Sequence, residues 1–426
     1  MRKLRTRLFV ALLWFLAPSL SCFAYSVLSH EALIDVLWDS ALKPALLQRF
    51  PNAAPEQLKE AHSYAYGGAI IQDMGYYPHG NGYFSDLTHY ARSADFILAL
   101  LRDSQSLDEY AFALGALSHY ASDNNGHRLA TNVGIPMLYP KLGRKFGKTV
   151  TYEDSPVTHL RIEYAFDVEE VAKENFAPQA YHDFIGFNVA RPVLEQAFRE
   201  TYGFELTVLF KDFDRTIGSY RHTLSTLIPF FTRVAWALHE DEIERARPGT
   251  TKRQFLYAMR RSSYEREWGR DYDRPTWRER LIAFIVKIFP PIGRIKILKF
   301  RALTPPVEQK FMESFNVATT EYRSQVSAAR SKRLALEDTN FDVGVPCGPG
   351  GYKLQDQTYA YWVDRLAQGK FSSMTPEVSR DILSYYSDMS KPFDTRNHPK
   401  DWKKLMGDLQ DLKSAATQEV TAAGRR

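Results

Sequence analysis

The chain has 426 residues, enough for one large domain or two to three smaller ones. Hydrophobic residues make up 44% of it, which supports a sizeable core and excludes global disorder. The formal net charge is +5. It falls to +1 when Arg2, Lys3, Arg5 and Arg7 are set aside with the segment that contains them, because that segment has no acidic residue. The basic balance therefore does not indicate a nucleic-acid partner.

Residues 1–24 have the pattern of a targeting segment. A basic start is followed by the short apolar run LFVALLWFLA and by SCFA, which ends in a small residue. This order predicts a signal peptide cleaved after Ala24, with Tyr25 as the new N-terminus. An uncleaved signal anchor or a lipoprotein processed at Cys22 are the alternatives. We expect export to the periplasm or the extracellular space, with or without membrane association.

Cleavage also removes one of the two cysteines. Cys347 is then the only cysteine of the mature chain, so an intramolecular disulfide is excluded. A cysteine-rich zinc site is excluded for the same reason. Any metal site must use histidine, aspartate and glutamate side chains.

Helical periodicity predominates along the chain and alternating strands are scarce, which predicts an all-α fold. A segment rich in glycine, tyrosine and proline, residues 74–86, predicts a loop. Helices are expected over residues 30–48, 55–72, 86–104, 107–124, 153–174, 180–201 and 205–246.

Residues 249–350 differ in composition from the rest. Between Lys252 and Arg301 there are 14 lysines and arginines against 5 aspartates and glutamates. Within this stretch, residues 281–301 mix cations with large apolar side chains, which is typical of an arm that lies on anionic lipid. A helical hairpin packed on the main domain, with its lysines extended to solvent, explains the same pattern.

A glycine-rich loop at residues 347–353 precedes a helical portion at about 355–416. We therefore divide the chain into four parts by sequence: 1–24 (signal peptide), 25–248 (main domain), 249–350 (basic and apolar helical insertion) and 351–426 (helical C-terminal region).

The stretch GALSHYASDNNGH carries His119, Asp123 and His127 at four-residue intervals, and THLRIEY repeats that spacing with His159 and Glu163. Four residues are about one helical turn, so each set lies on one face. Imidazoles and carboxylates projecting from neighbouring helices build metal sites in helical bundles, and mixed nitrogen and oxygen ligands favour zinc over calcium or magnesium. The alternative is a buried, hydrogen-bonded polar layer.

Three further residues complete the candidate set. Asp73 ends an apolar helix at the mouth of the aromatic loop, and His89 begins the next helix. Each alone is more commonly a cap or a surface residue. His30 lies five residues after the expected cleavage point, so the new α-amino group and carbonyl of Tyr25 could chelate a metal together with it.

In order and rough spacing these residues resemble the zinc-dependent phospholipase C family, which shares its fold with the single-strand-specific zinc nucleases of fungi and plants. The resemblance covers residues 25–165 well and 166–246 loosely, and 250–426 not at all. Two departures are visible: tyrosine stands at the mature N-terminus where the family has tryptophan, and Asp123 precedes His127 by four residues rather than six.

The resemblance implies an all-α, multi-helix bundle of the phospholipase C and zinc nuclease type, here with a helical C-terminal extension, that binds up to three zinc ions. It also implies that Asp73 is the general base or orients the attacking water. The implied ligands are Tyr25 and His30 for one zinc; Asp73, His89 and His119 for a second; Asp123 as a bridge between these two; and His127, His159 and Glu163 for the third.

Adjacent zinc ions neutralise a phosphate and lower the pKa of bound water, so the predicted reaction is hydrolysis of a phosphodiester by zinc-activated water. The first hypothesis is a phospholipase C that releases phosphorylated headgroups and contacts the membrane peripherally through residues 281–301. Its other support is a set of aromatic residues that suit a lipid interface or a choline cation, namely Tyr76, Tyr77, Tyr83 and Phe84.

A single-strand-specific zinc nuclease would use the same metal site and stack bases on these aromatic rings. The near-neutral mature charge and the lack of disulfides disfavour it. A non-catalytic zinc-binding structural protein is the third hypothesis. The sequence predicts no specific protein partner.

Overall fold

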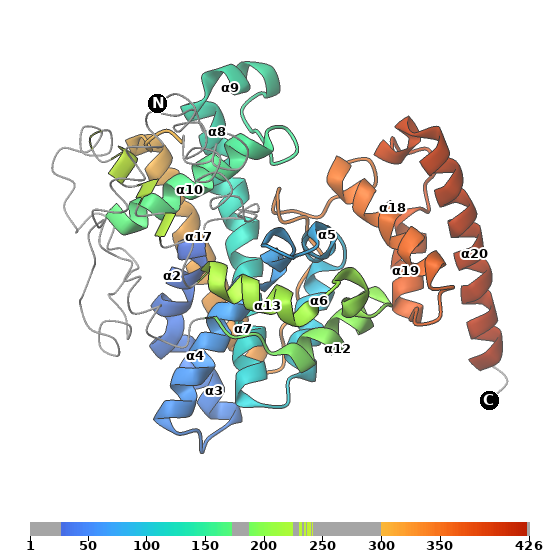
Figure 1. The fold of residues 1–426 in the computed structure, drawn as a ribbon, viewed down its shortest axis with the longest axis horizontal. Coiled ribbons are helices and arrows are strands. Elements are labelled where there is room, and N and C mark those ends of the chain that lie inside the picture. The colour runs from blue at the N-terminus through green and yellow to red at the C-terminus, as the bar shows by residue number, and fades with distance from the viewer. Residues whose placement is uncertain are drawn as a thin grey trace, which may run out of the picture.

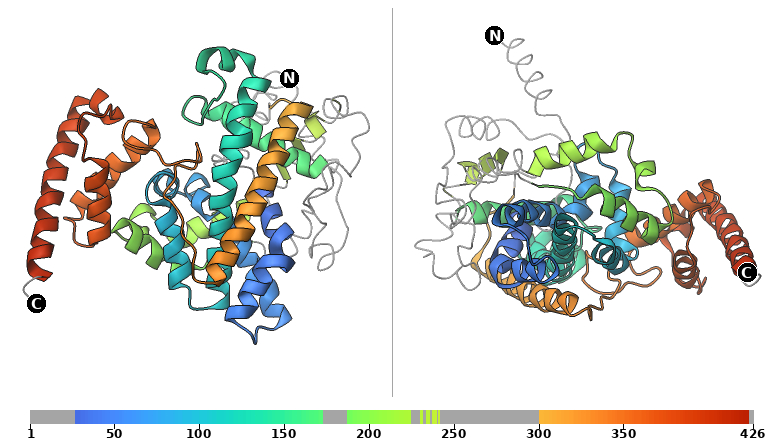
Figure 2. Two further views of the ribbon diagram at one scale, coloured as in Figure 1. Left: turned by 180° about the vertical axis from the view of Figure 1, so that it is seen from behind. Right: turned by 90° about the horizontal axis from the view of Figure 1, so that it is seen from below.

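The computed structural model describes residues 27–172, 187–224 and 300–423, together with a few positions between 230 and 241. The expected signal peptide, Tyr25 and the first half of the expected insertion, including residues 281–299, lie outside the described residues. Within them the fold is all-α, as predicted, and the only β pairing is the isolated bridge between Asn340 and Val345. Figures 1 and 2 show the helices gathered around α7, with the C-terminal helices at one end.

The N-terminal helices form one side of the bundle. The helix expected over 30–48 is present, but it contains a π-helical turn and so divides into three. The bounds are α2 (Val27–Leu37), η1 (Trp38–Leu42) and α3 (Lys43–Arg49), followed by α4 (Pro55–Ala69) and η2 (Ile71–Tyr76).

The prediction of a single helix over 86–104 is wrong, because α5 (Gly82–Tyr90) and α6 (Ser93–Asp103) are separate helices. Arg92 interrupts them with a left-handed backbone, φ 49°. Its side chain holds the backbone in this conformation, because it donates to Asp95 at 2.7 Å and to the carbonyl of Thr201 at 2.7 Å. The expected loop over 74–86 is correspondingly shorter, since η2 and α5 occupy both of its ends.

Helix α7 (Leu107–Gly126) is the central helix. A capping box starts it: Ser106 Oγ accepts from the amide of Glu109 at 3.2 Å, and the Glu109 carboxylate accepts from the amide of Ser106 at 3.1 Å. From Tyr110 onward every residue of α7 is buried. The chain continues into η3 (His127–Thr131), α8 (Asn132–Leu138) and α9 (Pro140–Phe146).

Helix α10 (Pro156–Ala172) matches the helix expected over 153–174. The next two expected helices, over 180–201 and 205–246, are shorter than predicted where the structure describes them, because residues 187–190 and 210–212 are not helical. Asp212 caps the second of these helices by accepting from the amide of Arg215 at 3.0 Å. The observed elements are α12 (Arg191–Tyr202), η4 (Leu206–Leu209) and α13 (Phe213–His222).

Helix α17 (Pro305–Arg330) comes from the expected insertion and packs along α7 (Figure 2, left). Phe315, Tyr322 and Val326 are part of the same hydrophobic core as α2 to α7. The Tyr322 hydroxyl donates to the carbonyl of Leu114 at 2.8 Å. The described part of residues 300–350 is therefore built into the main bundle.

The C-terminal region is helical, with α18 (Lys353–Gln368), α19 (Pro376–Tyr385), η7 (Asp394–Asn397) and α20 (Pro399–Ala423). Trp362 joins it to the bundle, because its indole nitrogen donates to the carbonyl of Tyr202 at 2.8 Å. Inside this region the rings of Tyr359 and Tyr385 stack at 3.7 Å.

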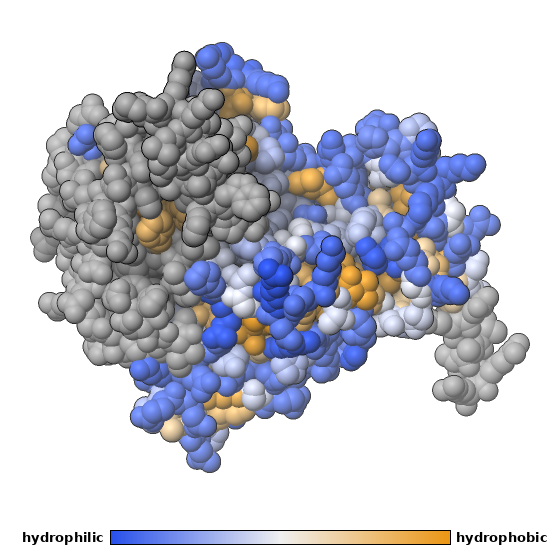
Figure 3. Space-filling model, viewed as in Figure 1, coloured by the Kyte–Doolittle hydropathy of each residue, from blue (hydrophilic) through white to orange (hydrophobic). Residues whose placement is uncertain are grey.

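Among the described helices, none combines the length and the apolar character that a bilayer crossing requires. On the face shown in Figure 3, the coloured surface is mainly hydrophilic and its hydrophobic residues form separate patches. The described residues therefore present no broad apolar surface on that face.

Candidate metal centre

Eight of the candidate residues fall into three buried groups, and His119 belongs to two of them; within each group the ligand atoms lie within 4.8 Å of one another. Every side chain in them is at most 2% exposed. These are the first cluster (His30, His119, Asp123), the second cluster (Asp73, His89, His119) and the third cluster (His127, His159, Glu163).

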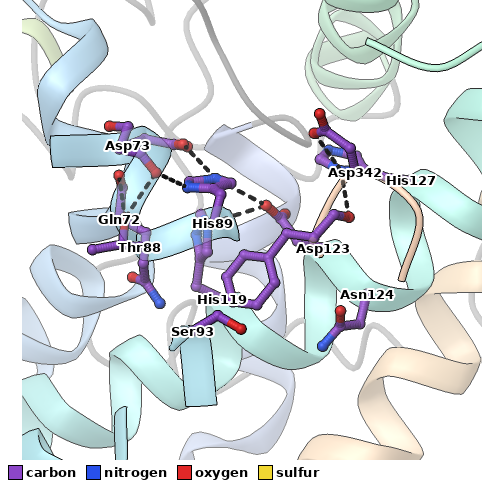
Figure 4. Close-up of polar contacts among 12 residues, drawn as sticks. Gln72, Asp73, Thr88, His89, Ser93, His119, Asp123, Asn124, His127 and Asp342 are labelled. Carbon is purple, nitrogen blue, oxygen red and sulfur yellow. Dashed lines mark hydrogen bonds and ion pairs between the residues drawn. The ribbon is translucent and has the colours of Figure 1, made fainter. Parts of the chain in front are cut away.

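Asp123, a member of the first cluster, also faces the second, and Figure 4 shows its carboxylate beside His89 and His119. Its Oδ1 is 3.4 Å from His30 Nε2, while its Oδ2 is 3.1 Å from His119 Nε2 and 3.5 Å from His89 Nε2. The rings of His30 and His119 stack with centroids 4.5 Å apart. The two oxygens of one carboxylate thus face different histidines, which is the arrangement that a bridging carboxylate requires.

Asp73 and His89 meet because η2 and α5 pack together. His89 Nε2 lies 3.3 Å from Asp73 Oδ1. Thr88 Oγ1 donates to the carbonyl of Gln72 at 3.2 Å, which fixes the helices beside the two ligands. This packing therefore brings Asp73 and His89, which are 16 residues apart in the sequence, into one site.

The third cluster joins α7 and η3 to α10. His127 Nε2 is 3.1 Å and His159 Nε2 is 2.7 Å from Glu163 Oε1. The helix continues through His127 without a break, so the four-residue step from Asp123 turns His127 toward α10. A π-helical turn begins at this residue, a feature frequently found at functional sites.

The outer ring nitrogens of three of the histidines are held by backbone carbonyls. His89 Nδ1 donates to Ser85 at 2.8 Å, His119 Nδ1 to Ala69 at 2.9 Å and His127 Nδ1 to Phe341 at 2.9 Å. A carbonyl only accepts, so each Nδ1 carries a proton and each Nε2 faces its cluster; once a metal is bound, the ring is neutral and offers the Nε2 lone pair. This is the usual support of a histidine that binds a metal.

Two glycines set the position of His119. A Cβ on Gly68 would lie 2.0 Å from the carbonyl oxygen of Phe112, and one on Gly115 would lie 2.1 Å from that of Ala65. Helices α4 and α7 therefore cross at a distance that only glycine permits. This crossing brings the carbonyl of Ala69 to the ring of His119.

Several inward-facing atoms of the clusters have no hydrogen-bond partner among the described residues: Asp73 Oδ1, His89 Nε2, His119 Nε2, both Asp123 oxygens and both Glu163 oxygens. No lysine or arginine of the described residues forms an ion pair with these carboxylates. Buried polar atoms are normally satisfied, and buried charge is normally paired or bound to metal. Cations at these positions would satisfy both conditions, and the nitrogen and oxygen donors suit zinc.

The pKa values show how strongly burial disfavours charged side chains in the clusters when no cation is bound. Burial lowers the pKa of His159 to about 4 and raises that of Glu163 to about 8. Burial opposes charge on Asp123 too, but without a metal the protonated rings of His119 and His127 outweigh it and hold the pKa of Asp123 well below its usual range. Opposing shifts of buried groups at one place are typical of functional sites.

The sequence-based assignment of the loop aromatics is largely wrong. Tyr77, Tyr83 and Phe84 are buried in the core, so Tyr76 is the only one of the four that is half-exposed. Its ring lies 6.1 Å from that of His89. A residue that the sequence did not indicate, Tyr152, lies in the same way beside His159 at 5.4 Å.

Two further residues near the clusters were not assigned from the sequence. His62 is not a ligand: it lies 3.2 Å from Asp35 and stacks on Trp38 at 3.8 Å. Asp342 was missed. It is buried, and its Oδ1 lies 3.7 Å from His127 Nδ1. No local spacing connects it to a ligand, so only a contact across the fold reveals it.

The fold and the clusters define the class of protein: an all-α bundle with buried groups of histidines and carboxylates suited to divalent metal. Residues 29–209 match the family model described as zinc dependent phospholipase C, and this confirms the family resemblance for that segment. Comparison with curated proteins and with solved structures returned no match. Asp342 and the helices from α13 onward lie beyond the matched residues.

Proposed function

We propose that this protein is a zinc-dependent phosphodiester hydrolase that acts on phospholipids and releases their phosphorylated headgroups. The observation that carries the proposal is the set of three buried clusters, two of which share His119. All three lie inside the segment that matches the zinc-dependent phospholipase C family. Zinc ions bound there would act as Lewis acids, neutralising phosphate charge and lowering the pKa of a bound water.

The protein residues have distinct roles in this proposal. The Nε2 atoms of His119, His89 and His127 face inward as neutral donors, and Asp123 joins the first two clusters. Asp73 Oδ1 lies 3.3 Å from His89 Nε2; with that nitrogen bound to zinc, the carboxylate would accept the proton of an attacking water or orient that water.

Two features favour a phospholipid over a nucleic acid. The formal charge without residues 1–24 is +1, which gives little long-range attraction to a polyanion. Half-buried Tyr76 and Tyr152 lie beside His89 and His159, where they could contact a cationic headgroup. Membrane contact through residues 281–301 remains part of the proposal. Of that segment Phe300 and Arg301 are described: Phe300 is buried, and Arg301 donates to the carbonyl of Leu138 at 2.5 Å.

Export belongs to the same proposal, because the predicted chelation by Tyr25 requires cleavage after Ala24. The start of α2 supports it. The amide of Leu28 donates to Asp167 Oδ1 at 2.9 Å, so the chain is anchored beside α10 three residues after Tyr25. His30 follows in the first turn and faces Asp123.

The decisive experiment measures the zinc content of the mature protein by elemental mass spectrometry, followed by release of headgroups from phosphatidylcholine vesicles and of nucleotides from single-stranded DNA. We expect close to three zinc ions per chain and activity on the vesicles. His119→Ala and Glu163→Ala should each lose zinc and activity. His398→Ala, an exposed histidine in the C-terminal region, is the matched control and should keep both. A wild-type protein purified without chelator that holds no zinc would refute the proposal, and activity on DNA alone would redirect it to a nuclease.

A further inference from the structure

Residues 337–345, here called the strap, follow α17 and lie outside the segment that matches the family. The strap is attached to α7 at its start and folds back on itself at its end. The Tyr120 hydroxyl donates to the carbonyl of Glu337 at 2.8 Å, and the amide of Asn340 donates to the carbonyl of Val345 at 3.0 Å. Asp338 accepts from the amide of Ala94 at 2.8 Å.

The strap lies directly against α7 beside the ligands. Gly344 has φ 67°, and a Cβ there would lie 2.0 Å from the carbonyl oxygen of Asn124, the residue after Asp123. Thr339 Oγ1 donates to Asn124 Oδ1 at 2.8 Å. Because glycine alone fits this contact, the strap is held at a fixed distance from the helix that carries His119, Asp123 and His127.

Phe341 contacts the clusters through its ring and its backbone. The ring centroid lies 5.2 Å from that of His89 and 5.9 Å from that of His119. Its amide donates to the carbonyl of His89 at 3.2 Å, and its carbonyl accepts from His127 Nδ1 at 2.9 Å. One residue of the strap therefore touches three histidines.

Asp342 adds a negative charge at the same place. Its Oδ1 lies 3.7 Å from His127 Nδ1. Its Oδ2 accepts from the hydroxyl of Tyr90 at 2.8 Å and from that of Tyr352 at 2.5 Å, and its carbonyl accepts from Asn132 Nδ2 at 2.6 Å. The hydroxyls of Tyr90 and Tyr352 thus orient the carboxylate while Asn132 of α8 holds its backbone, and no lysine or arginine of the described residues pairs with it.

We propose that Asp342 is a positioning residue of the third cluster: together with the carbonyl of Phe341 it holds the His127 ring with Nε2 toward Glu163 and makes that imidazole a stronger zinc ligand. A carboxylate near the outer nitrogen of a histidine fixes the ring and raises its basicity as a ligand, and removing such a partner typically weakens metal binding about 10- to 100-fold. This inference rests on the proposed zinc site. It assigns the region beyond residue 209 a part in the metal centre.

The test compares zinc affinity in three full-length, processed proteins by competition with a chromophoric chelator, with zinc content by elemental mass spectrometry. Asp342→Asn keeps the shape and removes the charge. We expect it to bind one of its zinc ions about 10- to 100-fold more weakly, with the others unchanged. Asp338→Asn lies in the same strap but caps α6, so it should lower stability without changing zinc affinity.

A second variant tests the same inference even if Asp342→Asn does not fold. Tyr90→Phe combined with Tyr352→Phe leaves the charge and removes the two hydrogen bonds that orient it, so we expect a smaller loss of affinity at the same zinc. Equal zinc affinity in Asp342→Asn, Asp338→Asn and the wild type would overturn the inference while leaving the proposed function intact. Complete absence of one zinc from Asp342→Asn at saturating metal would make Asp342 a direct ligand and would also overturn it. Absence of zinc from the wild type would instead refute the proposed function.

Discussion

Replacing Gly115 by alanine tests whether the crossing of α4 and α7 positions His119. The new Cβ would lie 2.1 Å from the carbonyl oxygen of Ala65 and 2.8 Å from the amide nitrogen of Ala69. Both obstacles are backbone atoms of a packed helix, so the two helices must separate by roughly 1 Å. The hydrogen bond from His119 Nδ1 to the carbonyl of Ala69, now 2.9 Å, would then exceed hydrogen-bonding distance.

Three contributions set the magnitude. Overpacking costs about 1–3 kcal/mol. The buried donor of His119, left without its acceptor, costs about 1–3 kcal/mol more. The better helix propensity of alanine offsets about 0.5–1 kcal/mol of this loss of stability. We therefore expect Gly115→Ala to lower the free energy of unfolding by about 1–5 kcal/mol and to weaken zinc binding at the two clusters that share His119.

Gly407 provides the matched control. It also lies within a helix, α20, but nothing is within 4 Å of a Cβ placed there. Gly407→Ala should leave zinc content unchanged and stabilise the protein by up to about 1 kcal/mol. Urea unfolding followed by circular dichroism gives the stabilities, and elemental mass spectrometry gives the zinc content. If Gly115→Ala matched Gly407→Ala in both, the helix crossing would not be what holds His119.

Three further predictions concern metal, the N-terminus and pH. Removing zinc with a chelator should lower the melting temperature by several degrees, because the buried carboxylates lose their counter-charge; zinc should restore it and magnesium should not. A methionine placed before Tyr25 should cost one zinc ion per chain, and retention of all of them by mass spectrometry would exclude chelation by the N-terminus. Burial raises the pKa of Asp381 to about 6, and the hydroxyl of Tyr359 donates to its carboxylate at 3.0 Å. Because this folded pKa is above the usual value, wild-type stability relative to Asp381→Asn is fully present below about pH 4 and is lost as pH rises through 6, by at most about 3 kcal/mol. Melting temperatures of both proteins between pH 4 and 8 test the sign, and a constant difference would contradict it.

Local spacing was sufficient for the parts of the site that lie within one helix. His119 with Asp123, and His159 with Glu163, are four residues apart, and helix geometry alone places such pairs on one face. The same periodicity predicted the all-α fold. It did not locate the break at Arg92, because a left-handed residue held by Asp95 and Thr201 depends on partners outside the local pattern.

Other features depend on contacts between distant segments. The sequence suggested that Asp73 and His89 share a site only through a family resemblance, whereas the packing of η2 against α5 brings their atoms within 3.3 Å. The same packing buries Tyr77 and Phe84, which the sequence had suggested for contact with a lipid interface or a choline cation. A residue's type and neighbours in sequence do not determine which side of a loop faces the core.

The sequence by itself therefore determined the candidate ligand set of this protein: histidines and carboxylates, most of them at helical spacing. Tertiary structure decided the rest. It brought Asp342 to His127 across more than two hundred residues, and it set the glycine contact between α4 and α7 that orients His119. The physical reason is that helix geometry fixes positions within a few residues, whereas the distance between helices is fixed only when their side chains and backbones pack.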